Sequence, residues 1–262
     1  MGRTAFYYNW VEQTGHTMPA PIRVLHVEDN PEFASMTATW LQRRVEAISV
    51  DRVPAPADGL EWLADSRPDC VVSDYQMPGM TGLEFLEEIR EEYPDLPFIL
   101  FTSKGSDEVA TDAIDAGVTD YLQKDTGMEQ YALLANRIEH AVARRRAERD
   151  YQTLLDNTPE GVAVCEPDSG VVIDANGRFC ELCGHNREDV LGASLTELTP
   201  AEAVVGDDLG NRLQLSTSDE AAAETVQHTF VDAAGNERRV DITVKPAEID
   251  GRQRVLAFVR PA

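Results

Sequence analysis

Five short apolar segments alternate with amphipathic helical segments between residue 22 and about residue 125, and this alternation restricts the fold more than any other feature. The apolar segments are residues 22–27, 48–53, 70–73, 98–101 and 120–122. The first, third and fourth are apolar almost throughout, which is typical of strands that helices cover on both faces. Strands that alternate with helices over about 100 residues predict an α/β fold with a doubly wound, five-stranded parallel sheet.

The expected helices of this part have recognisable N-termini. Asn30 followed by Pro31 offers an N-cap and a proline at the first helical position. Thr81 and Glu84 have the spacing of a capping box. Ser106, followed by two acids, places a cap and favourable charge at the start of another helix.

After Pro159 the pattern changes to short strands and tight turns. The expected strands are residues 161–165, 171–175, 224–231, 238–249 and 252–259, with a helix at 178–183. Hairpin turns are expected at 234–236 and at Asp250-Gly251, and the second is the stronger signal. The pattern predicts an α+β domain of about 110 residues with an antiparallel sheet.

These patterns divide the chain into four segments. Residues 1–20 are expected to be a loose N-terminal extension, since they lack the basic start and apolar block of a secretory signal. Residues 21–126 form the α/β domain, residues 127–157 a long linker helix, and residues 158–262 the antiparallel domain. No run of 18 apolar residues occurs, so we expect no membrane association and a cytoplasmic location.

The charge balance is strongly acidic, with 47 acidic and 23 basic residues and a formal net charge of −24. Only three of the basic residues are lysines: Lys104, Lys124 and Lys245. Such self-repulsion loosens a fold in dilute buffer but is largely screened at molar salt, where the Debye length is about 3 Å. The composition therefore resembles that of proteins from salt-in halophilic archaea. It argues against nucleic-acid binding, which requires a basic surface.

Polar residues follow the carboxyl ends of four expected strands. Glu28 and Asp29 end the first, Asp74 the third and Thr102 the fourth, while Lys124 follows the fifth. Ligands bind at this edge of open α/β sheets. Three converging carboxylates repel one another unless a hard cation, here Mg²⁺, neutralises them. An ammonium and a hydroxyl then complete a cradle for a phosphoryl group.

The adjacent acids Glu28 and Asp29 alone do not indicate a metal site, because neighbouring acids occur by chance in a chain with 47 acidic residues. The combination is informative because all five residues end the correct strands and one of only three lysines lies at the required place.

Four motifs of this part strongly resemble those of response-regulator receiver domains. They are residues 24–30 (VLHVEDN), 73–79 (SDYQMPG), 101–104 (FTSK) and 120–124 (DYLQK). The resemblance covers about residues 21–140 and implies a flavodoxin-like fold. It also implies that Asp74 accepts a phosphoryl group from the phosphohistidine of a sensor histidine kinase. Glu28 and Asp29 would hold Mg²⁺ together with Asp74 and the backbone carbonyl of Gln76.

The same resemblance assigns roles to three further residues. Thr102 would bond the phosphoryl group, Lys124 would pair with it, and Tyr121 would be the aromatic residue that turns inward after phosphorylation. The family usually has a proline in a cis peptide after this lysine, but this chain has Asp125. A cis bond without proline costs about 3–4 kcal/mol, so we expect a trans bond, which leaves open how closely Lys124 approaches the site. Glu28 is a second departure, because aspartate is commoner there.

Residues 148–262 resemble a PAS domain. The resemblance depends on residues 154–162 (LLDNTPEGV) and on Asp174-Ala175-Asn176 followed by Phe179 and Gly184. Gly177 occupies the position where flavin photosensors carry a reactive cysteine, which disfavours flavin adduct chemistry. His185 and His228 are interpreted as ordinary residues rather than haem ligands. The sequence identifies no PAS ligand, and the domain could have none.

The four cysteines are Cys70, Cys165, Cys180 and Cys183. Their irregular spacing in a cytoplasmic chain indicates reduced thiols. Cys180 and Cys183 have no second pair of ligands at zinc spacing, so no zinc site is expected.

Three functional hypotheses follow. In the first, the receiver passes its phosphorylation state through the linker helix to the PAS domain, and the chain is a homodimer through these two parts. In the second, the PAS domain senses a small molecule and the receiver modulates that response. In the third, the chain is a fragment of a hybrid sensor histidine kinase. The sequence contains neither a kinase phospho-acceptor histidine motif nor a glycine-rich ATP lid, so we expect no enzymatic activity beyond phosphorylation and dephosphorylation of the receiver.

Overall fold

The computed structural model describes residues 21–103, 107–167, 169–195, 198, 225–232, 234–249 and 251–262. The expected N-terminal extension (residues 1–20), the expected cap Ser106 and the first residue of the expected strand at Glu224 lie outside the described residues. The chain forms two compact units, which divide between residues 147 and 148.

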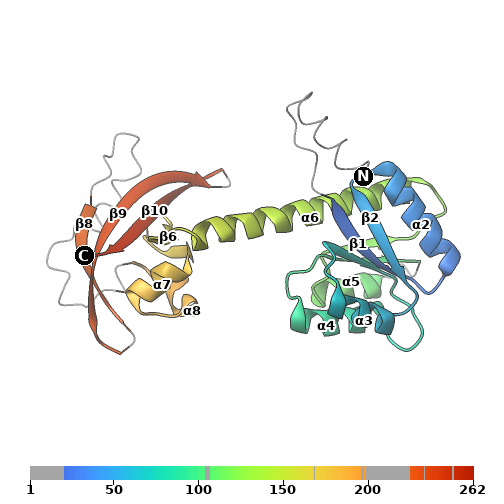
Figure 1. Ribbon diagram of the computed structural model, residues 1–262, viewed down its shortest axis with the longest axis horizontal. Coiled ribbons are helices and arrows are strands. Elements are labelled where there is room, and N and C mark those ends of the chain that lie inside the picture. The colour runs from blue at the N-terminus through green and yellow to red at the C-terminus, as the bar shows by residue number, and fades with distance from the viewer. Residues whose placement is uncertain are drawn as a thin grey trace, which may run out of the picture. The chain divides into compact units, whose positions relative to one another are not determined.

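The first unit contains the parallel sheet (Figure 1). Its elements are β1 (Ile22–Val27), α2 (Pro31–Arg44), β2 (Ile48–Val53), α3 (Pro56–Asp65), β3 (Cys70–Ser73), α4 (Gly82–Glu92), β4 (Phe98–Thr102), α5 (Asp107–Asp115), β5 (Asp120–Gln123) and the first part of α6 (Glu129–Asp156). All strand pairs are parallel, in the order β2-β1-β3-β4-β5. The predicted doubly wound, five-stranded parallel sheet is therefore confirmed.

Helices cover both faces of this sheet, as the nearly continuous apolar strands predict. One buried cluster joins the sheet to α2 and α6 and includes Leu41, Phe101 and Ile138. A second cluster lies on the opposite face, beneath α3, α4 and α5, and includes Phe85 and Phe98. β3 and β4 are buried along their whole length. Because the chain passes over β1 on its way from β2 to β3, the topological switch point lies between the ends of β1 and β3.

Two predicted helix starts are confirmed. The Asn30 side chain accepts hydrogen bonds from the backbone N–H groups of Glu32 and Phe33, and Pro31 opens α2. Thr81 and Glu84 form the complete capping box of α4.

The linker helix begins at Glu129, two residues after its expected start. Gln130 explains the difference, because its side chain bonds the loop that precedes the helix. Its amide oxygen accepts from the backbone N–H of Asp125, and its amide nitrogen donates to the carbonyls of Asp125 and Gly127. No helix among the described residues is long and apolar enough to cross a membrane.

The second unit contains an antiparallel sheet in the order β7-β6-β10-β9-β8. Its elements are β6 (Gly161–Cys165), β7 (Val172–Ala175), α7 (Gly177–Cys183), α8 (Arg187–Val190), β8 (Thr225–Val231), β9 (Glu237–Ile249) and β10 (Arg252–Pro261). Its core includes Phe179 on α7 and Phe230 on β8, whose rings meet edge to face at 5.8 Å. The predicted α+β domain with an antiparallel sheet is confirmed (Figure 1).

Asn176 is a buried polar residue whose side chain connects several parts of this second unit. Its side-chain oxygen accepts hydrogen bonds from the backbone N–H groups of Val162 and Phe179, each at 2.8 Å. Its amide nitrogen donates to the carbonyls of Leu155 at 2.8 Å and Glu160 at 3.0 Å. One fully buried side chain therefore ties the last turns of α6 to β6 and caps α7.

The four cysteines are free. Burial raises the pKa of Cys165 to about 12 and that of Cys183 to about 11, and it also raises the pKa of Cys70 and Cys180. Thiols with raised pKa values carry little thiolate at neutral pH, so these cysteines are poor nucleophiles.

Candidate functional site

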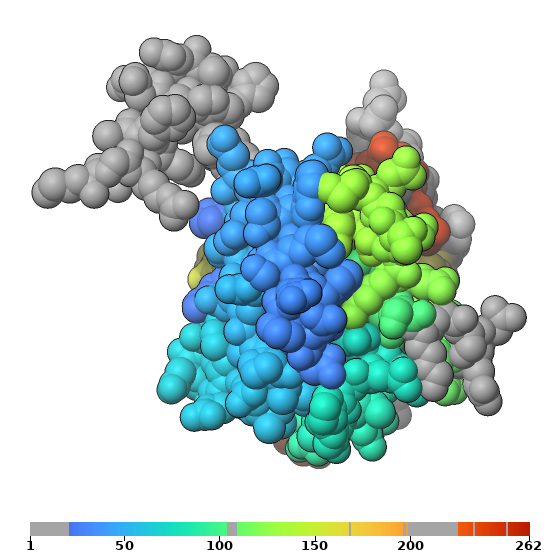
Figure 2. Space-filling model, turned by 90° about the vertical axis from the view of Figure 1, so that its right-hand side faces the viewer, coloured from blue at the N-terminus to red at the C-terminus, as the bar shows by residue number. Residues whose placement is uncertain are grey.

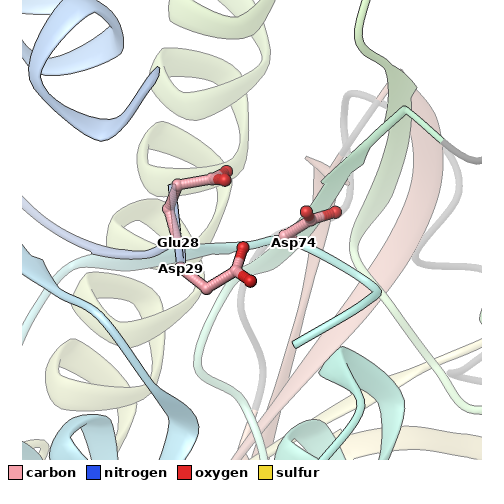
Figure 3. Close-up of side chains that lie close together, drawn as sticks. All are labelled: Glu28, Asp29 and Asp74. Carbon is pink, nitrogen blue, oxygen red and sulfur yellow. The ribbon is translucent and has the colours of Figure 1, made fainter. Parts of the chain in front are cut away.

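Three carboxylates meet where β1 and β3 end (Figure 3). Glu28 and Asp29 follow β1 directly, and Asp74 follows β3. One oxygen from each lies within 4.8 Å of the others, with Glu28 and Asp74 buried and Asp29 exposed. Hard divalent cations prefer oxygen ligands in such a cluster, so these three residues fit a Mg²⁺ ion.

Only 7% of Asp74 is exposed, and each of its carboxylate oxygens has a partner within the protein. Its Oδ1 accepts a hydrogen bond of 2.6 Å from the backbone N–H of Tyr75, and its Oδ2 lies 3.0 Å from the Lys124 ammonium. Its own backbone N–H donates to the carbonyl of Val27 on the neighbouring strand. The carboxylate is therefore fixed in direction at the edge of the sheet.

The Lys124 ammonium reaches the site. Nζ lies 2.6 Å from Oε2 of Glu28 as well as 3.0 Å from Asp74, and its side chain is only 10% exposed. The backbone N–H of Lys124 donates to the carbonyl of Thr102 at 2.7 Å, which continues the pairing of β4 with β5. The peptide bond to Asp125 is trans, as expected, and the ammonium approaches both carboxylates with that geometry.

Glu28 is buried beside the Lys124 ammonium. Burial raises its pKa, while the hydrogen bond and the charge of Lys124 act in the opposite direction. Its second oxygen accepts a hydrogen bond of 3.3 Å from the backbone N–H of Asn30. A buried carboxylate with a raised pKa gains from any cation that comes close, which makes Glu28 a favourable metal ligand.

The remaining predicted site residues lie on β4, on β5 and in the loop after β3, and they are not among the residues that line the cavity at the cluster. Thr102 is the buried last residue of β4. Tyr121 lies on β5, half-buried against the cluster beneath α3, α4 and α5, and burial raises its pKa. Gln76 is exposed in the loop after β3.

Sequence reasoning missed several residues of the pocket. A cavity of about 470 Å³ is lined by Glu28, Asp29, Asn30, Phe33, Asp74, Ser103, Lys124, Asp125 and Thr126. Phe33 lies four residues after Asp29, in the first turn of the helix that leaves the strand end. An aromatic residue at that place was a signal that could have been used, because the first turn of such a helix borders the ligand crevice.

Family models match both units of the chain. Residues 24–136 match the response regulator receiver domain, and residues 155–262 match the PAS fold. The chain therefore contains a response regulator receiver domain followed by a PAS fold. No kinase domain is among these family matches.

Curated relatives match the receiver. The probable transcriptional regulatory protein TcrX of Mycobacterium tuberculosis is 34% identical over 113 residues, which cover 43% of this chain and 47% of that protein. Hybrid signal transduction histidine kinase D of Dictyostelium discoideum is 30% identical over 139 residues, or 51% of this chain and 8% of that protein. The chain spans about half the length of the first curated relatives it matches.

Solved structures resemble each domain separately. Chemotaxis protein CheY4 of Vibrio cholerae is 27% identical, with a TM-score of 0.42, and the match covers 45% of this chain and 99% of CheY4. The PAS domain of an HTR-like protein from Haloarcula marismortui is 22% identical, with a TM-score of 0.36, and the match covers 45% of this chain and 99% of that domain.

The histidines of the PAS domain have ordinary structural contacts. His185 Nε2 lies 2.6 Å from the carbonyl oxygen of Val231. The ring of His228 packs edge to face on Phe230, and burial lowers its pKa.

His26 is a buried polar residue of the receiver that the predicted chemistry does not use. It lies on β1 and is 1% exposed, and neither ring nitrogen has a hydrogen-bond partner among the described residues. Burial, followed by the nearby charge of Lys124, lowers its pKa from 6.5 to about 3. His26 is therefore neutral in the folded receiver at neutral pH.

We expect His26→Leu to reduce the acid sensitivity of the receiver. Between about pH 6.5 and pH 3 the unfolded chain binds a proton on His26 that the folded protein does not, so the free energy of unfolding falls as the pH falls. From pH 7 to about pH 4, wild type should lose about 3 kcal/mol more stability than the variant. Urea unfolding at several pH values measures this, and parallel pH profiles for the two proteins would contradict it.

Proposed function

We propose that the receiver takes a phosphoryl group onto Asp74 from the phosphohistidine of a sensor histidine kinase, in a reaction that requires Mg²⁺. The observation that carries this proposal is the contact of the Lys124 ammonium with Asp74, in a cluster where three carboxylates lie within 4.8 Å of one another. The match to the receiver family supports phosphorelay signalling as the general role.

In the transfer, a carboxylate oxygen of Asp74 attacks phosphorus, a P–O bond forms, and the P–N bond to the kinase histidine breaks as its imidazole leaves. Glu28, Asp29, Asp74 and the carbonyl of Gln76 would hold Mg²⁺, which neutralises charge on the transferring oxygens. Lys124 would contribute a second positive charge beside the new acyl phosphate, a role that its contact of 3.0 Å with Oδ2 of Asp74 supports. The hydroxyl of Thr102 would bond a phosphoryl oxygen.

Phosphorylation by a small donor tests this proposal. Purified protein with acetyl phosphate and Mg²⁺ should gain the mass of one phosphoryl group, which hydroxylamine removes because it cleaves acyl phosphates. Chelation of Mg²⁺ with EDTA should prevent the gain. Failure to gain the group from either acetyl phosphate or a purified kinase would overturn the proposal, as would a label that resists hydroxylamine.

We further propose that the phosphorylated state reaches the PAS domain through Tyr121 and α6, and that α6 and the PAS domain form a homodimer. Leu154 near the end of α6 is 73% exposed, which supports a partner surface there. Light scattering on wild type and Leu154→Glu tests the dimer; equal masses at all concentrations would exclude Leu154 from the interface.

The acidic composition supports a cytoplasm of high salt as the working environment. With a formal net charge of −24, charge repulsion should destabilise the fold in dilute buffer. We expect the urea midpoint of unfolding to fall steeply when KCl is lowered below about 1 M, because the Debye length then grows beyond about 3 Å. A midpoint that is independent of KCl would contradict this proposal.

A further inference from the structure

The Lys124 ammonium has an aromatic neighbour as well as two carboxylate partners. Its Nζ lies 4.4 Å from the centre of the Phe33 ring and 5.9 Å from that of Phe101. A cation within about 6 Å of an aromatic ring centre is attracted by the negative face of the ring, and the attraction is larger when the cation is desolvated. With a side chain that is 10% exposed, Lys124 meets that condition.

The Phe33 ring is fixed in place from two directions. It packs against Phe101 at 5.7 Å and against Tyr131 of α6 at 6.3 Å. Figure 2 shows the blue helix α2 beside the yellow-green segment that contains the start of α6. The backbone N–H of Phe33 also donates to the N-cap oxygen of Asn30, whose own N–H donates to Glu28. These two hydrogen bonds connect the backbone of Phe33, through Asn30, to the carboxylate of Glu28.

The ring differs from the two carboxylates in one important respect. Glu28 and Asp74 are also the residues that would hold the metal ion, and a cation on Glu28 weakens its attraction for Lys124. The Phe33 ring is neutral and is not a metal ligand, so its attraction for the ammonium is independent of the metal.

We propose that Phe33 is a positioning residue for phosphoryl transfer, which holds the Lys124 ammonium beside Asp74 when Mg²⁺ engages the carboxylates. This inference rests on the proposed function of Asp74. The residue acts through Lys124 and does not itself contact the phosphoryl group.

Phe33→Leu tests this inference, because leucine keeps an apolar side chain but removes the aromatic face. At saturating Mg²⁺ we expect phosphorylation by acetyl phosphate to slow about three- to tenfold. The Mg²⁺ affinity should change less than about twofold, and Phe33→Tyr and Phe33→Trp should restore the rate, since both rings keep the negative face. A wild-type rate in Phe33→Leu, or no rescue by either aromatic variant, would overturn the inference.

Trp40→Leu is the matched control. Trp40 lies on the same helix and stacks on the same Tyr131 at 6.2 Å, but it is not one of the rings that Lys124 approaches in the described part of the chain. We expect this variant to lower the melting temperature without slowing phosphorylation. A rate loss equal to that of Phe33→Leu would show that general loosening of α2 is the cause, and would overturn the positioning role.

A second readout separates this inference from the proposed function. In NMR spectra, the Lys124 side-chain protons of wild type should be shifted upfield by the ring current of Phe33, and Phe33→Leu should remove that shift. If wild type takes up no phosphoryl group, the proposed function fails. The NMR comparison still shows whether the Lys124 ammonium contacts the Phe33 ring. Identical Lys124 resonances in the two proteins would exclude the ring–ammonium contact and with it the inference.

Discussion

Asp74→Asn should reduce phosphoryl uptake to background, with either acetyl phosphate or a cognate kinase as the donor. The amide has no anionic oxygen to attack phosphorus, so the nucleophile is lost rather than weakened. The variant keeps the size of the side chain and an oxygen to accept the bond from the Tyr75 N–H. We therefore expect the free energy of unfolding to stay within about 1 kcal/mol of wild type.

Asp51→Asn is a suitable control for this substitution. Asp51 pairs with Arg23 on the exposed surface, away from the site. The Asp51→Asn variant should take up the phosphoryl group at the wild-type rate, because the change removes one acid but leaves Glu28, Asp29 and Asp74 unchanged. Full uptake in Asp74→Asn, with the label mapped to another residue, would disprove Asp74 as the acceptor.

Asn176→Ala should destabilise the PAS domain by about 3–5 kcal/mol. At this fully buried position the change removes the side-chain acceptor of the Val162 N–H and the side-chain donor to two carbonyls. The Phe179 N–H also loses its side-chain acceptor and keeps only the longer bond of 3.1 Å to the backbone carbonyl of residue 176. Each buried unsatisfied polar group costs about 1–3 kcal/mol. In a domain of this size the melting temperature should fall by more than about 10 °C, measured by calorimetry on the whole chain.

Asn157→Ala is the matched control for this second prediction. Asn157 follows α6 directly, and its exposed side chain donates to the carbonyl of Thr153 at 2.8 Å. We expect it to cost less than about 1 kcal/mol. Similar losses for the two variants would mean that the buried network of Asn176 contributes little to stability.

The receiver fold could be predicted almost completely from the sequence, because strands covered on both faces leave a nearly continuous apolar pattern. β3 and β4 show this most clearly, since every residue of both is buried. The residues at the strand ends followed from the same prediction, since parallel strands end at one edge. Their convergence within 4.8 Å at Glu28, Asp29 and Asp74 agrees with that expectation.

What the sequence could not predict depends on individual contacts that neither apolar periodicity nor motif spacing encodes. Lys124 approaches Asp74 with its backbone N–H bonded to Thr102 and its ammonium over the ring of Phe33, and no local pattern reveals either contact. The start of α6 at Glu129 depends on the three hydrogen bonds of the Gln130 side chain. β10 extends to Pro261, two residues beyond its expected end at residue 259, because its last residues pair with β9. Pro261 pairs with Val240, which lies 21 positions earlier in the chain.

Asn176 also has a consequence for protein engineering. Because it donates to the carbonyl of Leu155, and because Gln152 donates to Asp174 at 3.4 Å, the last turns of α6 belong to the PAS scaffold. A chimaera joined where the helix ends, after Asp156, would replace the turns of α6 that bond Asn176 and Asp174 with residues of another protein. A PAS domain that is to be transferred to another protein should therefore begin upstream of Gln152, with the junction inside α6.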